Sequence, residues 1–259
     1  MSVCGFCGEN ATLTVEDAIP KWMAQLKPEN VRVKAEWEHR NVRKWTTWKN
    51  KVELTARAFC GRCNNGWMSD LENEAKPYLI PMLLGYEVKL PSKAQTIVSI
   101  WVMKTTMVME FTGASTRAKH FTPLERRTFS VLQTPPSGVL IFLAGYVGRH
   151  AFSAQEHHLN FRRDGNRFPG YSATLQWGAL IGQVLAHRGG SESSRFQVRA
   201  TYDPAECEVW PMKRATITWP PEAVLDDVEL PRYAQRWLPP EHPAGEADPP
   251  QEGDPRARR

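Results

Sequence analysis

Hydrophobic positions in the first half of the chain recur at helical spacing. The run NNGWMSDLENEAKPYLIPMLL predicts a helix that begins near Asn64 and places Trp67 and Leu71 on one face. Pro77 and Pro81 are expected to limit its regular length. The run SKAQTIVSIWVMKTTMVMEFT is apolar around much of its circumference, which predicts a largely buried helix. TPLERRTFSVLQ predicts a short helix with a threonine cap and a proline in its first turn.

The pattern changes in the second half of the chain. The segments GVLIFLAGYV, ATLQWGALIGQVLAH, RFQVRATY and CEVWP are rich in β-branched and aromatic residues, and Gly and Pro punctuate them. They predict three to five strands, mostly antiparallel. Helices followed by strands indicate an α+β fold, in which a zinc unit precedes a mixed helical and antiparallel β region.

We expect three parts: a cysteine-bearing unit over residues 1–75, an α+β domain over 76–238, and a tail over 239–259. The tail is rich in Pro, Glu, Gly, Asp and Arg, which predicts disorder.

Length and apolar content set the class of protein. The chain has 259 residues, enough to bury a full core. Its longest apolar runs are too short for a membrane helix, and its beginning shows no secretory signal. We therefore expect a cytoplasmic protein with no membrane partner, in which paired cysteines bind metal more often than they form disulfides.

Positive charge is concentrated in one insert. Residues 21–57 contain ten Lys or Arg and four Glu, a net of +6, whereas the whole chain has a net charge of +5. The insert also holds four of the ten tryptophans. Cations beside aromatic rings suit a nucleic-acid partner, and DNA contacts are expected at Arg43, Lys44, Lys49 and Lys51. A solvated hairpin that packs its tryptophans inward explains the same pattern.

Two cysteine pairs carry the strongest chemical signal. Cys4 and Cys7, followed by Gly8, and Cys60 and Cys63 have the spacing of a four-thiolate zinc site. A knuckle, an intervening hairpin and a helix that carries the last two ligands make a treble-clef arrangement. Unpaired buried thiols are the alternative. The fifth cysteine, Cys207, is expected to be a small core residue.

A second cation site is suggested by the residues after each cysteine pair. Asn64 follows the last cysteine directly, and Glu16 and Asp17 lie in the segment after the first pair. An amide oxygen and a carboxylate suit a hard divalent cation that stabilises charge on a phosphodiester. A helix cap explains Asn64 equally well.

Cys4-x-x-Cys7, TVEDAIPKW and FCGRCNNGWMSDLE together resemble the HNH endonuclease superfamily in its zinc-bound ββα-metal form. The pattern is similar to a bacterial and phage group with C-x-x-C, E-H-x-x-P-x-W and C-x-x-C-N-N-G-W-M. The resemblance implies that the four cysteines hold structural zinc. It also implies that Glu16 and Asn64 contact a catalytic Mg²⁺ or Mn²⁺.

The chain departs from this pattern at Asp17, which stands where the family has the histidine that activates water. A carboxylate with an ordinary pKa near 4 is a much weaker base than imidazole. The middle asparagine of the motif has no clear match. His39 lies in the basic insert as another source of imidazole, whereas His157 and His158 would point to opposite faces of a strand.

Three hypotheses follow. The first is a metal-dependent DNA endonuclease with Glu16, Asp17 and Asn64 at the cation. The second is a catalytically inactive, zinc-stabilised module that binds nucleic acid or protein. The third is a structural partner protein whose β-rich part is the working surface.

Overall fold

The computed structural model describes residues 1–26, 33–39, 42–48, 54–112, 119–163, 166–188 and 204–238, and for 24, 33–39, 42–48, 162–163 and 166 the backbone alone. The expected disordered tail, residues 239–259, and the strand expected at 195–202 lie outside the described residues.

The cysteine-bearing unit is built from two short antiparallel strand pairs and a helical run. β1 (Ser2–Val3) pairs with β2 (Asn10–Ala11), and β3 (Leu13–Asp17) pairs with β6 (Thr55–Cys60). A short helix, α1 (Lys21–Gln25), follows β3. The helical run after β6 consists of α2 (Gly61–Cys63), the π-helical turn η1 (Asn64–Met68) and α3 (Ser69–Leu83).

The α3 helix is longer than the sequence predicts. It continues through Pro77 and Pro81 to Leu83, so the expectation that these prolines limit it was wrong. Each proline removes a backbone donor, but Leu79 and Met82 are fully buried on the same face. Burial of that face against the core offsets the lost hydrogen bonds.

Two predicted helices are confirmed. α4 (Ser92–Met109) is buried almost all round, and α5 (Pro123–Leu132) begins with a capping box between Thr122 and Glu125. α3 packs along α4, and α4 packs on the large sheet. Before α4, β7 (Val88–Pro91) pairs with β13 (Thr216–Trp219).

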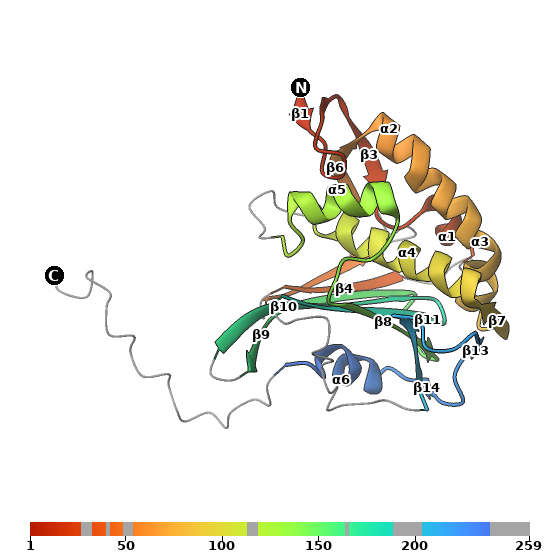
Figure 1. The fold of residues 1–259 in the computed structure, drawn as a ribbon. Helices are drawn as coiled ribbons and strands as arrows, with labels where there is room; N and C mark the ends of the chain where they lie inside the picture. Colours follow the sequence, from red (N-terminus) through yellow and green to blue (C-terminus); the bar gives the residue numbers. More distant parts are fainter. Residues whose placement is uncertain are drawn as a thin grey trace.

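The large sheet has the strand order β12-β8-β11-β10-β9-β4-β5, with β14 beside β8. Its strands are β4 (Val33–His39), β5 (Val42–Trp48), β8 (Val139–Tyr146), β9 (Phe152–Arg163), β10 (Asn166–Trp177), β11 (Leu180–His187), β12 (Glu206–Trp210) and β14 (Val224–Leu225). All pairs are antiparallel except β4 with β9 and β14 with β8. Figure 1 shows α3, α4 and α5 over one face of this sheet and α6 (Glu229–Gln235) on the other.

The second half contains more strand than the sequence predicts. β9 and the first part of β10 were missed because EHHLNFRR and its continuation are polar and charged, without the apolar alternation that marks a half-buried strand. The basic insert forms the β4–β5 hairpin, and β4 lies beside β9, so the insert extends the large sheet.

The mixed α and antiparallel β composition is thus confirmed. One hydrophobic cluster runs from the cysteine-bearing unit into the helices and the sheet. Phe6 of the first knuckle stacks on Phe59 and meets Trp67 edge to face. The predicted limit at residue 75 falls inside α3. As a division into domains it stays a prediction. Among the described residues, no helix is long and apolar enough to cross a membrane.

Candidate metal centre and acidic cluster

The four predicted cysteines converge on one point. Their Sγ atoms all lie within 4.8 Å of one another. Cys4 Sγ is 3.9 Å from Cys63 Sγ, and Cys7 Sγ is 3.8 Å from Cys60 Sγ. A tetrahedron of sulfurs about 2.3 Å from a zinc ion has edges of about 3.8 Å. The cluster therefore has the dimensions of a four-thiolate zinc site.

The local fold holds this tetrad in place. The amide of Gly8, whose φ is +75°, donates to the Cys4 carbonyl and closes the first knuckle. The amide of Cys60 donates to Cys4 Sγ at 3.3 Å, which ties the end of β6 to the knuckle. Gly5 lies so close to the Phe111 ring that an added Cβ would come within 2.7 Å of it. The knuckle is thus packed directly against the helical layer.

The thiols have unequal affinities for protons. Burial raises the pKa of Cys4, but backbone donors at Cys60, Cys7 and Phe6 outweigh it and bring that pKa to about 7. Burial and the negative charge of Cys4 raise the pKa of Cys63 well above its ordinary value. Four adjacent thiolates need a compensating cation, which a zinc ion held by the four sulfurs would supply. Across the part of the chain that the structure describes, these four residues are the one group of three or more such side chains able to hold a metal.

Asn64 does not cap the helix. Its φ and ψ are helical, −64° and −53°, and no side chain caps the helical run at Cys60 or Cys63. Instead its amide Nδ2 donates to Thr14 Oγ1 at 3.0 Å and to the Val15 carbonyl at 3.2 Å. The strand register shifts at this point, between Thr14 and Glu16. Asn64, the residue directly after Cys63, is therefore joined to the irregular part of β3.

Glu16 and Asp17, adjacent on β3, enter different surroundings. Glu16 is buried, with 8% of its surface exposed. The Asp17 side chain is 31% exposed and lies 3.6 Å from the ammonium of Lys21. The structure thus brings Asn64 to the strand that carries both acids, and it buries one carboxylate while leaving the other partly exposed.

The partner of Glu16 is a buried lysine. Lys104 Nζ lies 3.7 Å from Glu16 Oε1 and 2.8 Å from Glu72 Oε1, and its side chain is fully buried. Burial raises the pKa of Glu16 to about 7, with Lys104 opposing this and the charges of Glu72 and Asp17 adding to it. We call Glu16, Glu72 and Lys104 the acidic cluster.

Sequence reasoning missed Glu72 and Lys104. Lys104 is the single charged residue between Lys93 and Glu110, inside a helix predicted to be buried. Because a buried ammonium needs a partner, that isolated charge was a signal that a carboxylate must lie opposite. The identity of the carboxylates depends on how α3 and β3 pack on α4, which the pattern does not give.

A hard cation fits this region in part. Mg²⁺ is commonly bound by one or two carboxylates, with water and substrate phosphate completing its shell. Glu16 and the amide oxygen of Asn64 are donors of that kind. Among the described residues, Glu16, Asp17 and Glu72 do not form a group of three convergent acidic ligands.

The residues expected to contact DNA are placed only in part. Arg43 and Lys44 lie on β5, the last strand of the large sheet, whereas Lys49 and Lys51 lie outside the described residues. His39 ends β4. His157 and His158 are confirmed as neighbours on one strand, β9, and only His157 is buried. Cys207 is half-buried and packs against the main core, close to the expectation of a core residue.

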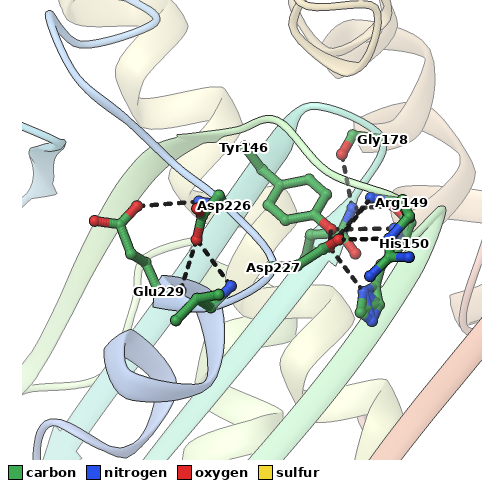
Figure 2. A network of polar contacts seen from close by, with 9 residues as sticks. Tyr146, Arg149, His150, Gly178, Asp226, Asp227 and Glu229 are labelled. Carbon is green, nitrogen blue, oxygen red and sulfur yellow. Dashed lines mark hydrogen bonds and ion pairs between the residues drawn. The ribbon is translucent and has the colours of Figure 1, made fainter.

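A second polar network joins two loops at the ends of strands of the large sheet, where β8 ends and β9 begins (Figure 2). Asp227 accepts hydrogen bonds from the Tyr146 hydroxyl and from Arg149 Nε, the latter at 3.0 Å, and lies 3.3 Å from His150 Nδ1. The hydrogen bond from Tyr146 is the main reason that the pKa of Asp227 falls to about 2. The His150 amide donates to the Tyr146 hydroxyl at 3.1 Å. These contacts fasten the loop before β9 to the loop before α6.

No protein-family model, curated protein or solved structure matches the chain. The resemblance to HNH endonucleases therefore rests on the motif residues alone.

Proposed function

We propose that the chain is an HNH-type, metal-dependent DNA endonuclease in which Asp17 replaces the usual histidine and lowers the rate. The observation that carries the proposal is the contact of Asn64 with Thr14 and Val15. It sets the residue after zinc ligand Cys63 against the strand of Glu16 and Asp17, which is the pairing that the motif resemblance implies.

In this proposal the zinc site is structural and the second cation is catalytic. Glu16 and the Asn64 amide oxygen would hold a Mg²⁺ or Mn²⁺ ion, which would stabilise charge on the scissile phosphate. Asp17 is exposed enough to meet water, and it would accept the proton of the attacking water as a weak general base. Loss of an efficient general base costs about 10²–10⁴-fold in rate, so slow cleavage is expected.

The DNA backbone would meet the basic hairpin. β4 and β5 extend the large sheet at its end beyond β9 and bring Arg43 and Lys44 to its last strand. The net charge of +6 over residues 21–57 supports salt-dependent contact with phosphates.

A second candidate is a zinc-stabilised module that binds nucleic acid without cleaving it. The observation in its favour is Lys104, whose ammonium already neutralises Glu16 at 3.7 Å, together with Lys21 beside Asp17. Both carboxylates expected near the catalytic cation thus have a protein cation close by.

Nicking of supercoiled plasmid with Mg²⁺ or Mn²⁺ tests both candidates. The wild-type chain is compared with Asn64→Ala, Asp17→His and Asp70→Asn, an exposed acidic residue on α3 that serves as the control. The endonuclease proposal expects slow nicking that Asn64→Ala abolishes, that Asp17→His accelerates and that Asp70→Asn leaves unchanged.

Wild-type protein that binds DNA at moderate salt but shows no nicking, with nicking gained in Asp17→His, would overturn the endonuclease proposal in favour of the binding module. Neither binding nor nicking by any variant would reject both.

A further inference from the structure

The acidic cluster is unusual because its positive charge is carried by a fully buried lysine, Lys104. Lys104 lies in the middle of α4, where its neighbours Met103 and Met107 are also fully buried. A buried ammonium is stable only with close partners, and here both partners are carboxylates. One ammonium therefore serves two acids.

The charges in this cluster do not balance once Glu16 is ionised, above its pKa of about 7. Two ionised carboxylates and one ammonium then leave an excess of one negative charge. Asp17 and Lys21 beside it cancel each other and leave that excess in place. The side chain of Glu72 is 19% exposed, whereas those of Glu16 and Lys104 are 10% and 0% exposed, so the cluster reaches solvent mainly at Glu72. A small cation can approach from the side of Glu72.

We infer that Lys104 competes with a hard divalent cation for Glu16. Glu72 is the second carboxylate, and it contacts whichever of the two cations, the Lys104 ammonium or the divalent ion, is in place. The inference deepens the proposed function and rests on it, because the cation concerned is the one expected beside Asn64. It assigns Lys104 and Glu72 as positioning residues that set how tightly this cation binds.

Distance and charge make the two cations exclude each other. A magnesium ion sits about 2.0–2.1 Å from a carboxylate oxygen, whereas the Lys104 ammonium is 3.7 Å from the same Glu16 group. A divalent ion on Glu16 would therefore stand within a few ångströms of the ammonium in a poorly solvated place. Repulsion there is strong, so the ion binds only when Glu16 turns away from Lys104.

The test measures Mn²⁺ binding to the zinc-loaded full chain by the electron paramagnetic resonance signal of free Mn²⁺. In Lys104→Met, which keeps the length of the side chain but not its charge, Mn²⁺ is expected to bind about tenfold tighter or more. Lys104→Arg keeps the charge and is expected to bind as the wild type does. Lys93→Met, at an exposed position on the same helix, is the matched control and should change nothing.

Glu72→Gln supplies an independent arm, because it leaves Lys104 in place and changes a partly exposed residue. It removes one carboxylate of the pair, so that the Lys104 ammonium pairs with Glu16 only. Mn²⁺ is therefore expected to bind more weakly than in the wild type. Circular dichroism and one zinc per chain establish that each variant is folded.

Equal or weaker Mn²⁺ binding in a folded Lys104→Met overturns the competition, as does unchanged binding in Glu72→Gln. Should Lys104→Met fail to fold, the Glu72→Gln arm alone decides. Plasmid nicking is scored separately: tighter Mn²⁺ binding in Lys104→Met with no nicking by any variant keeps this inference and rejects the endonuclease.

Discussion

The chain contains two clusters of negatively charged or ionisable ligands, and the negative charge is neutralised differently in each. The cysteine tetrad brings four soft ligands to sulfur–sulfur distances of 3.8 and 3.9 Å, the edges of a zinc tetrahedron. The acidic cluster brings two carboxylates to a lysine at 2.8 and 3.7 Å. The first is shaped for a cation from outside, whereas the second contains one of its own.

The difference shows what makes a group of ligands a metal site. In the tetrad, close thiolates repel each other until a metal neutralises them, so folding and metal binding are coupled. In the acidic cluster the ammonium provides part of that neutralisation within the fold. A divalent ion is then optional for stability, even where it is required for the proposed chemistry.

The largest expected effect is therefore loss of zinc. Cys63→Ser removes one thiolate at the centre of a core that includes Phe6 and Phe59. We expect the free energy of unfolding to fall by roughly 5 kcal/mol or more, with loss of bound zinc. Chemical denaturation and zinc analysis by mass spectrometry measure both.

Cys207→Ser is the matched control, since Cys207 is half-buried and lies outside the tetrad. It should keep one zinc per chain and most of the stability. Full zinc content and wild-type stability in Cys63→Ser would show that the tetrad is not a structural metal site.

The second prediction concerns Lys104→Met measured without added divalent cations. Removal of one partner of a buried ion pair leaves charges uncompensated, and we expect a loss of about 3–5 kcal/mol in urea unfolding. Addition of Mn²⁺ should recover part of this loss in the variant and almost none in the wild type.

A double-mutant cycle makes this prediction sharper. Glu72→Gln in the Lys104→Met background removes one of the two unpaired acids, so the double variant should be more stable than Lys104→Met alone. Additive losses would mean that Lys104 and Glu72 do not interact, contrary to their distance of 2.8 Å.

The same comparison explains what the sequence could predict. Spacing along the chain identifies Cys4, Cys7, Cys60 and Cys63, because each pair is local and only two segments must meet. Periodicity likewise predicts α4 and α5. Glu72 and Lys104 are 32 residues apart and come together only through helix packing, which no local pattern encodes.

The polar strand β9 could not be predicted from the sequence for a related reason, since it also depends on tertiary contacts. β9 carries Gln155, Glu156 and His157 in buried positions, so its pattern of polar and apolar residues does not follow its burial. Tertiary pairing with β10, and not local preference, makes this segment a strand. Asn64 is an intermediate case, since the sequence indicated its importance but not its contact with Thr14 and Val15.

The third prediction is a pH dependence that comes from Glu16. Its pKa is raised from 4.5 to about 7 in the folded protein, so the folded state holds a proton that the unfolded state has lost. The free energy of unfolding contributed by Glu16 therefore falls as pH rises from about 4.5 to 7, by about 3 kcal/mol at most.

This effect is measured as the difference between the wild type and Glu16→Gln from pH 5.5 to 8, which cancels the opposite effect of zinc loss in acid. Relative to the variant, the wild type should lose stability as pH rises to about 7 and change little above it. A difference that does not change with pH would mean that Glu16 is ionised throughout and that Lys104 neutralises it fully.

The smallest expected effect comes from Asp227, a partly exposed carboxylate that accepts hydrogen bonds from the end of β8 and the loop after it. Hydrogen bonds from Tyr146 and Arg149 keep its pKa near 2, so their stabilisation is present above about pH 4 and is lost as pH falls toward 2. Asp227→Asn keeps the shape and weakens these bonds, and we expect a loss of about 1–2 kcal/mol at pH 7, against no measurable change in Asp70→Asn. Zinc content and Mn²⁺ affinity should not change in Asp227→Asn. If Mn²⁺ affinity did fall, the acidic cluster would be coupled to the loops that Asp227 joins.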